Sequence, residues 1–244
     1  MLQLNNITWN TPDGSQILKG ITLTIPDDKL VVITGPNGSG KTTLAKIIAG
    51  LEMPESGSII FNGKDITKCD VTERAKLGIS YAFQQPIRFK GITVRDMLSL
   101  ASQKPLTEMQ MCQILDKVGL CAKDYLDREI NASLSGGEIK RIEIATVFTR
   151  NTMLTVFDEP EAGIDLWSFS NLINVFKQLR QTLNGSLIII SHQERIIDIA
   201  DEIIVIADGK LQNSGSKSSL LGTLNLNLTG CNTCPKGREV FKHE

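Results

Sequence analysis

A glycine-rich segment that ends in lysine and threonine is the clearest chemical signal in the chain. It contains Gly35-Pro-Asn-Gly-Ser-Gly-Lys41-Thr42 and matches the pattern G-x-x-x-x-G-K-[ST] of phosphate-binding loops. Its glycines let successive backbone N–H groups point at phosphate oxygens, and a helix beginning near Lys41 adds the positive end of its dipole. We expect Lys41 to reach the β- and γ-phosphates and the Thr42 hydroxyl to bind Mg²⁺. The predicted nucleoside triphosphate site comprises Gly35, Pro36, Asn37, Gly38, Ser39, Gly40, Lys41, Thr42 and Thr43.

Two adjacent carboxylates follow an apolar run at residues 153–157. A carboxylate at the carboxyl end of a core strand lies beside the phosphate loop in an α/β sheet, so we expect Asp158 to hold Mg²⁺ through its water shell. Glu159 is then placed to polarise a water in line with the γ-phosphate, as a general base. The alternative is a solvated acidic turn without a ligand. Because Pro160 intervenes and fixes the turn, we expect Glu161 to be a surface or interface charge.

His192 follows another apolar run, Leu187–Ile190. A lone histidine at a strand end is usually structural, but this strand is the expected parallel neighbour of the strand before Asp158. The end of the strand would therefore fall near the γ-phosphate, and we expect His192 to contact it.

The segment Leu134-Ser-Gly-Gly-Glu138 is a second candidate anion-binding site. Ser135 and Glu138 have the spacing of a capping box, which predicts a helix N-terminus with free N–H groups and a hydroxyl. Because one chain then has two anion-binding sites, we expect the second one to bind the nucleotide held by another molecule.

The elements that must position these residues follow from the apolar runs. Runs that are apolar on both faces are typical of parallel strands covered by helices on each side. They alternate with amphipathic stretches such as Glu138–Arg150 and Leu166–Leu183, which predicts an α/β, doubly wound core. The expected core strands cover residues 30–33, 79–83, 153–157, 187–190 and 203–206, and a helix is expected over residues 43–49.

Three regions depart from this alternation. Leu4–Pro26 contains short strand-like pieces around a turn signal at Thr11-Pro-Asp-Gly14, which predicts an antiparallel flap. Pro86–Asn131 has little strand character and is expected to be mostly helical, with a capping box formed by Thr107 and Gln110. Ser214–Ser219 is small and polar, and it is expected to be a loop before the tail.

Composition narrows the classes of function. The 244 residues carry a net charge of −1, with 22% charged and 5% aromatic residues, which argues against a polybasic nucleic-acid or membrane-surface binder and against base-stacking platforms. The longest apolar runs are far shorter than the roughly 20 residues that a membrane-spanning helix needs. Five cysteines, an odd number, indicate reduced thiols. We expect a soluble, cytoplasmic protein with no nucleic-acid partner.

Taken in order, these motifs resemble those of the ATP-binding-cassette (ABC) ATPases, from about residue 2 to residue 221. The resemblance implies a phosphate-loop NTPase core with a mixed, mostly parallel sheet, an N-terminal antiparallel β lobe and an inserted helical lobe at about residues 86–134. It places the ATPase domain at residues 1–222 and a tail at residues 223–244. It also implies the cofactors ATP and Mg²⁺.

The resemblance further implies that two copies of the chain pair head to tail. Each ATP would be closed between one copy's phosphate loop and the other's Ser135, Gly136 and Gly137. Gln84 would contact Mg²⁺ and water and couple the helical lobe to the nucleotide. Ala162–Asp165 would lie at the dimer seam, and His192 would act as a γ-phosphate switch.

Three stretches are similar to the ATPase of the Suf-type iron–sulphur cluster assembly machinery, which works with a β-helical scaffold instead of a membrane channel. They are Tyr81–Pro86, Ser135–Arg141 and Ser191–Ile196. The partner expected from this similarity is a Suf-type scaffold protein, and the alternative is a membrane permease. Transport ATPases usually stack an aromatic residue on adenine. In this chain Thr11 falls at that position, and the nearby Trp9 could substitute.

The tail contains a C-x-x-C pair, Cys231 and Cys234. One such pair supplies half of a tetrahedral metal site, so a site would need a second pair from a dimer partner. The pair could also bind part of a cluster or act in redox chemistry, and the plain alternative is a tail with incidental thiols.

Overall fold

The computed structural model describes residues 1–85, 89–102, 104–131, 133–150, 152–182, 185–217 and 219, with the backbone alone at 166 and 167. Cys231 and Cys234, and the predicted tail at residues 223–244, lie outside these residues. The bounds predicted for the ATPase domain, 1–222, therefore stay a prediction.

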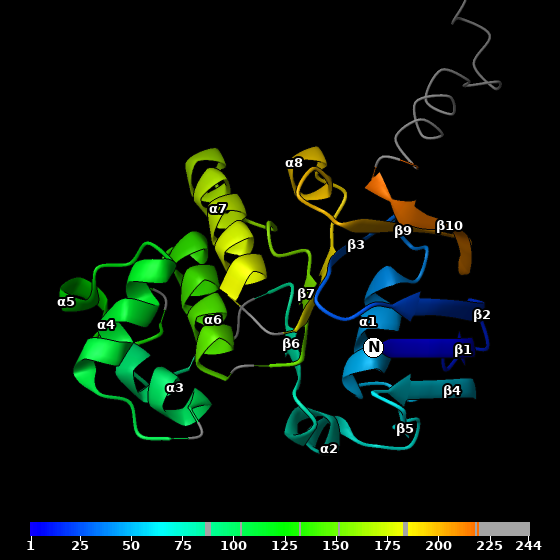
Figure 1. The fold of residues 1–244 in the computed structure, drawn as a ribbon, viewed down its shortest axis with the longest axis horizontal. Coiled ribbons are helices and arrows are strands. Elements are labelled where there is room, and N and C mark those ends of the chain that lie inside the picture. Colours follow the sequence, from blue (N-terminus) through cyan, green and yellow to red (C-terminus); the bar gives the residue numbers. More distant parts are fainter. Residues whose placement is uncertain are drawn as a thin grey trace, which may run out of the picture.

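The central sheet contains six strands of the described residues, in the order β10-β9-β3-β8-β7-β6 (Figure 1). Pairing is parallel from β9 to β6, and β10 runs antiparallel to β9. This mixed, mostly parallel sheet confirms the predicted fold class. The bounds are β3 Leu30–Thr34, β6 Ile79–Ala82, β7 Leu154–Asp158, β8 Ser186–Ile190, β9 Glu202–Ala207 and β10 Lys210–Ser216.

Both faces of the central sheet are buried, by different elements. Val32 and Ile189 belong to a core that contains α6 (Gly136–Arg150) and α7 (Leu166–Thr182). Their chain neighbours Val31 and Ile188 belong to a second core with α1 (Lys41–Ala49) and the antiparallel sheet. Successive strand residues point to opposite faces, so a strand covered on both sides must be apolar at every position. This explains the unbroken apolar runs.

The antiparallel sheet has the order β2-β1-β4-β5 in the described residues. β1 (Leu2–Asn10) pairs with β2 (Gln16–Ile25), which confirms the predicted N-terminal flap. β4 (Ser56–Phe61) and β5 (Lys64–Asp65) complete this sheet and were not predicted from the sequence.

The helical lobe lies at the opposite end of the molecule from the antiparallel sheet (Figure 1). It contains α3 (Val94–Ala101), α4 (Glu108–Lys117) and α5 (Ala122–Tyr125). Thr107 and Gln110 form the predicted capping box at the start of α4. The remaining described helices are the short α2 (Val71–Lys76) and α8 (Glu194–Ile197).

The prediction of a loop at Ser214–Ser219 was wrong for its first half. Ser214 and Ser216 belong to β10 and pair with Ile204 and Glu202 of β9. Small polar residues have low strand propensity, but β9 offers an edge whose backbone groups need partners, and this pairing outweighs propensity.

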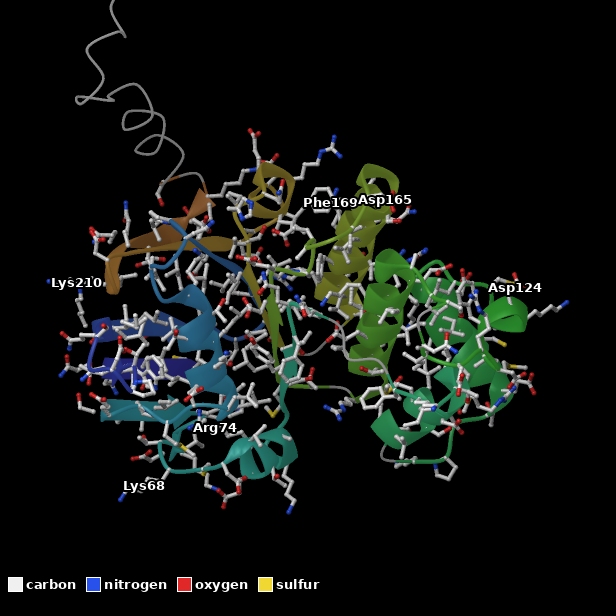
Figure 2. All side chains as sticks on the ribbon, turned by 180° about the vertical axis from the view of Figure 1, so that it is seen from behind. Lys68, Arg74, Asp124, Asp165, Phe169 and Lys210 are labelled. Carbon is white, nitrogen blue, oxygen red and sulfur yellow. The ribbon has the colours of Figure 1, made fainter. Side chains whose placement is uncertain are left out.

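The far end of α1 is held by a buried arginine. Arg74 is fully buried, and its guanidinium donates hydrogen bonds to the carbonyl oxygens of Ile47 (2.5 Å) and Ile48 (3.0 Å), in the last turn of α1. It also donates to Cys69 O and Thr67 O. Figure 2 shows Arg74 at this end of the helix. Because a helix leaves its last carbonyl groups without partners, these bonds fix the helix that begins at the phosphate loop.

Within the described part of the chain, no helix combines the length and the apolar character needed to cross a bilayer.

Candidate nucleotide site

The phosphate loop connects β3 to α1, and its curl requires glycine. Gly35, Gly38 and Gly40 have φ angles of 140°, 78° and 96°, where residues with a side chain are strained. A Cβ added at Gly35 would lie 1.9 Å from the carbonyl oxygen of Ile206, and one at Gly40 would lie 2.6 Å from Leu18 Cδ2. The loop therefore packs closely against β9 at Gly35 and against β2 of the antiparallel sheet at Gly40.

Lys41, the first residue of α1, lies folded over the loop. It is 6% exposed, and its Nζ donates to the carbonyl oxygens of Gly35 and Pro36, both at 2.8 Å. Burial lowers the pKa of Lys41, while the carboxylates of Glu159 and Asp158 oppose that shift. The ammonium group is thus placed at the loop mouth beside two acidic groups, as the sequence predicted.

Thr42 and Asp158 meet across α1 and β7. The Thr42 hydroxyl donates to Asp158 Oδ1 at 3.0 Å, and Asp158 is 1% exposed. Tyr81, on β6, donates its hydroxyl to the other carboxylate oxygen at 2.7 Å. Burial, followed by this hydrogen bond, raises the pKa of Tyr81 well above its ordinary value, so the phenol stays a donor. Tyr81 was not predicted as a site residue; its position three residues before Gln84 was the available signal.

Glu159 has a strained backbone with φ 42°, a region that residues other than glycine rarely adopt. Its N–H donates to Ile190 O of β8 at 3.0 Å, which ties the turn to the neighbouring strand. Gln84 Nε2 donates to Glu159 Oε2 at 2.5 Å. The predicted general base and the predicted water-contacting glutamine are therefore side by side.

Glu161 was expected to be a surface or interface charge, and the surface part of this prediction is wrong. Its side chain turns inward, and Ser191 Oγ, at the end of β8, donates to its carboxylate. Its second oxygen is buried and has no hydrogen-bond partner among the described residues. Pro160 lies in a turn closed by the hydrogen bond from Ala162 N to Glu159 O at 3.0 Å, and the Glu161 side chain after it points into the protein. His192 follows Ser191 and is exposed.

The N-terminus of α6 forms the predicted capping box. Glu138 Oε2 accepts from Ser135 N at 2.7 Å, and Glu138 N donates to Ser135 Oγ at 3.3 Å. The Tyr125 hydroxyl donates to the other carboxylate oxygen of Glu138. Burial acts to raise the pKa of Glu138, but the hydrogen bonds from Tyr125 and Ser135 outweigh it and lower the pKa.

This capping box corrects the expectation of free N–H groups. The N–H groups of Ser135 and Glu138 are paired inside the chain, which leaves those of Gly136 and Gly137, at the first two helical positions, for an outside anion; Gly136 is half-buried and Gly137 is buried.

A pocket of about 500 Å³ opens over the phosphate loop. Most of its lining residues were predicted from the sequence, and Trp9 and Ile17 come from the antiparallel sheet. His192 and the segment Ser135–Gly137 are not among its described lining residues. The lining consists of Trp9, Thr11, Ile17, Asn37, Gly38, Gly40, Lys41, Thr42, Thr43, Gln84 and Glu159.

The residues around this pocket fit a Mg²⁺-bound nucleoside triphosphate. Ser39 Oγ is buried without a hydrogen-bond partner in the described residues, and the loop glycines Gly38 and Gly40 line the pocket, where they add no side chain. The hydroxyl of Thr42 and the carboxylate of Asp158 are hard oxygen donors of the kind that Mg²⁺ prefers. The cation would be held at this pair, and it would supply neutralisation of phosphate charge.

Residues 18–162, more than half of the chain, match the sequence profile of the family described as ABC transporter. The chain belongs to the ABC transporter family. As a member of this family it is an ATPase that uses ATP and Mg²⁺.

Two relatives of this ABC ATPase extend the match to most of its length. An uncharacterized ABC transporter ATP-binding protein of Methanocaldococcus jannaschii is 40% identical over 82% of this chain and 83% of its own length. The probable ATP-dependent transporter ycf16 of Cyanophora paradoxa is 35% identical over 88% of each chain.

The fold of this ABC ATPase is also found among solved structures. One is an ATP-binding cassette described as a dimer in a post-hydrolysis state, bound to ADP and phosphate. It has a TM-score of 0.78 and 23% identity over 89% of this chain and 99% of its own. At this identity the likeness shows the fold alone.

Proposed function

We propose that the chain hydrolyses MgATP at two composite sites between two copies of itself packed head to tail. The observation that carries the proposal is the separation of two anion-binding devices within one chain. The phosphate loop lines the pocket with Gln84 and Glu159, whereas Gly136 and Gly137 lie outside the lining. A second copy in the opposite orientation would bring its α6 N-terminus to the pocket mouth, where the helix dipole favours phosphate.

The chemistry follows from the contacts in the pocket. Backbone N–H groups of the loop and the Lys41 ammonium orient the β- and γ-phosphates of the substrate. Glu159 accepts a proton from a water molecule, and the oxygen of that water attacks the γ-phosphorus. The bond between the γ-phosphorus and the β–γ bridging oxygen then breaks, and ADP and phosphate leave. Gln84, 2.5 Å from Glu159, orients the same water. His192 contacts the γ-phosphate and senses its loss.

Trp9 takes the adenine ring in this proposal. It lines the same pocket as Lys41, and Thr11, where transport ATPases carry their stacking aromatic, lacks a ring. The indole face provides the flat apolar surface on which a purine stacks.

Support for a dimer comes from the Ala162–Asp165 segment and from the fold. Asp165 Oδ1 accepts from Ser168 N at 3.0 Å and thereby caps the start of α7 (Figure 2). In the same segment, the carbonyl oxygen of Gly163 lies 3.2 Å from where a Cβ of Gly136 would be, so the segment is held beside the α6 N-terminus. The dimeric post-hydrolysis cassette has the same fold.

The proposed partner is a scaffold protein of the Suf type, in which opening and closing of the ATPase dimer drives a conformational change. Its support is the sequence similarity at Tyr81–Pro86, Ser135–Arg141 and Ser191–Ile196. A membrane permease is the second candidate, because both relatives described above carry names that refer to transporters.

A cytoplasmic location is part of this proposal. In the described part of the chain Cys69, Cys112 and Cys121 form no disulfide, which fits a reducing compartment.

The test of the dimer uses Glu159→Gln with MgATP. This variant binds ATP but lacks the base, so we expect turnover to fall roughly 10²–10⁴-fold and the ATP-bound dimer to accumulate. Light scattering after size exclusion should then give twice the chain mass of 26.8 kDa. Lys41→Ala, which should not bind ATP, is the matched control and should stay at the mass of one chain. Near-normal turnover of Glu159→Gln would remove Glu159 from its role.

The test of the partner is affinity capture of the full chain from native extract, with identification of the protein recovered in equal amount. A scaffold protein without membrane spans supports the Suf-type proposal. Recovery of an integral membrane protein would replace it with the permease.

A further inference from the structure

The buried carboxylate of Glu161 has no part in the mechanism given above. It follows the general base by two residues, and Ser191 donates its hydroxyl to it across the gap between the β7–α7 connection and the end of β8. Ser191 is fully buried and Glu161 is half-buried, so the contact is partly shielded from water. The other oxygen of Glu161 has no partner in the described residues, and Ser191 is therefore the side chain to which this carboxylate is tied.

Ser191 has a second contact, to the residue that follows His192 in the chain. Its Oγ accepts a hydrogen bond from the backbone N–H of Gln193 at 3.0 Å. A serine hydroxyl that bonds the N–H two residues ahead forms a local turn, and the residue between them is held at its apex. Because the hydroxyl proton goes to Glu161, the oxygen lone pairs face Gln193 N. The backbone turn that carries His192 thus depends on the rotamer that Glu161 imposes on Ser191, and the imidazole contacts the side chain of the next residue in that turn, with 3.5 Å between His192 Nε2 and Gln193 Nε2.

We propose that Glu161 is a positioning residue, which fixes the Ser191–Gln193 turn and so sets the direction of the His192 imidazole. This inference rests on the proposed role of His192 at the γ-phosphate. It also connects the two sides of the site, because Glu161 is in the same turn as Glu159, and His192 follows the neighbouring strand. A shift of the β7–α7 connection, which we propose lies at the dimer seam, would be passed to His192 through this hydrogen bond.

The charges around Glu161 agree with a link to His192 that depends on the Ser191 hydrogen bond. Burial raises the pKa of Glu161, and the nearby Glu159 carboxylate adds to that shift, while Ser191 and His192 oppose it. An ion pair is therefore not the main interaction of this carboxylate. An amide oxygen in the same place would accept the Ser191 hydrogen bond equally well.

The experiment reads out His192 directly, without nucleotide. The chain has two histidines, His192 and His243, so a His243→Gln background leaves one imidazole signal in a ¹H–¹³C spectrum of histidine-labelled protein. In this background we compare Glu161→Ala, Glu161→Gln and Ser191→Ala. Glu194→Ala is the matched control, since it removes an exposed carboxylate from the first residue of α8.

We expect Glu161→Ala and Ser191→Ala to move the His192 signal in the same direction. Glu161→Gln keeps the acceptor for Ser191 and removes only the charge near His192, so we expect it to move the signal much less, and Glu194→Ala to leave it in place. The double variant should move it no further than either single change, because both remove one interaction. In ATP turnover we expect Glu161→Ala to lower kcat about tenfold with KM nearly unchanged, and Glu161→Gln to retain most of the activity.

Three results would overturn the inference: an unmoved His192 signal in Glu161→Ala, equal damage by Glu161→Gln and Glu161→Ala, or a moved signal with wild-type kcat. Failure of the proposed function is seen separately. If the wild-type chain shows no ATP turnover, or His192→Ala has wild-type turnover, the role at the γ-phosphate is refuted, while the spectra still decide whether Glu161 holds the turn.

Discussion

Replacement of Tyr81 by phenylalanine removes one hydroxyl from the centre of the site and little else. The ring packs edge-to-face against Phe83, with centroids 4.9 Å apart, and phenylalanine keeps that contact. What is lost is the 2.7 Å hydrogen bond to Asp158, a carboxylate that is 1% exposed and therefore cannot gain water in exchange. Hydrogen bonds to charged groups contribute about 1.5–3 kcal/mol, so we expect the free energy of unfolding to fall by about 2 kcal/mol.

The same substitution predicts a change in the pH dependence of stability. The pKa of Tyr81 is raised in the folded state, so the folded protein keeps this proton when the unfolded chain has lost it. Its contribution is then fully present below the ordinary tyrosine pKa of about 10 and is lost as the pH rises above it. The difference in stability between wild type and Tyr81→Phe should be constant from pH 7 to 9 and shrink above pH 10. Tyr125 also has a raised pKa, but it is present in both proteins and cancels in the difference.

Urea denaturation followed by circular dichroism, at a series of pH values, measures both effects. A companion titration should show that Tyr81→Phe needs roughly 10–100 times more Mg²⁺ to support ATP binding, as is typical when a group that orients a metal-binding carboxylate is lost. A change in stability below about 0.5 kcal/mol, or a difference that grows above pH 10, would refute the reasoning.

Further predictions concern the loop, the far end of α1 and the base pocket. Gly40→Ala, with φ 96° and a Cβ 2.6 Å from Leu18, should weaken ATP binding at least tenfold by isothermal titration, and unchanged affinity would contradict the cradle geometry. Arg74→Leu removes the buried guanidinium that donates to four carbonyl oxygens; Ile47 O keeps the N–H of Gly50, but Ile48 O loses its donor in the core. We expect the free energy of unfolding to fall by about 3–5 kcal/mol in urea, which a shift under 1 kcal/mol would exclude. Trp9→Ala should raise KM for ATP about tenfold while KM for a triphosphate without a base stays as it was; equal effects on both would remove Trp9 from the adenine site.

The candidate site was predicted from the sequence mainly because parallel strands align their carboxyl ends. The phosphate loop follows β3, Asp158 ends β7, and His192 follows β8, and these three strands are neighbours in the sheet. Once the apolar runs are assigned to a parallel sheet, the residues just after them must lie at one edge. Motif spacing then predicted the chemistry of Lys41 and Thr42, and this prediction needed no long-range information.

What the sequence did not predict depends on side-chain directions that no local pattern encodes. Tyr81 is one of several residues on β6, and its role arises only because β6 lies beside β7 and its hydroxyl reaches Asp158. Glu161 is of a residue type that is usually exposed. It turns inward because the strained backbone at Glu159 rotates the chain before Pro160. In both cases tertiary geometry, rather than residue type or period, determines the outcome.

The fold shows the same division between local and long-range causes. The capping box at Thr107 is a local signal, and α4 begins where it predicts. β10 continues through Ser214–Ser216 against propensity, because its partner β9 is fixed elsewhere in the sheet and supplies the backbone hydrogen bonds. A strand that forms because of its neighbour in the sheet cannot be predicted from its own residue types.

A mixture of two inactive variants provides the most direct measurement of the central claim, that each ATP is shared between chains. Lys41→Ala disables the phosphate loop, and Ser135→Arg blocks the α6 N-terminus with a bulky cation. Each alone should have negligible ATPase activity. Random encounter pairs one chain of each kind in half of all pairs, and every such pair has one site built from two intact parts, so we expect recovery of about one quarter of wild-type turnover. No recovery in the mixture, with both variants folded and Ser135→Arg still binding ATP, would contradict the shared site, as would full activity of Ser135→Arg by itself.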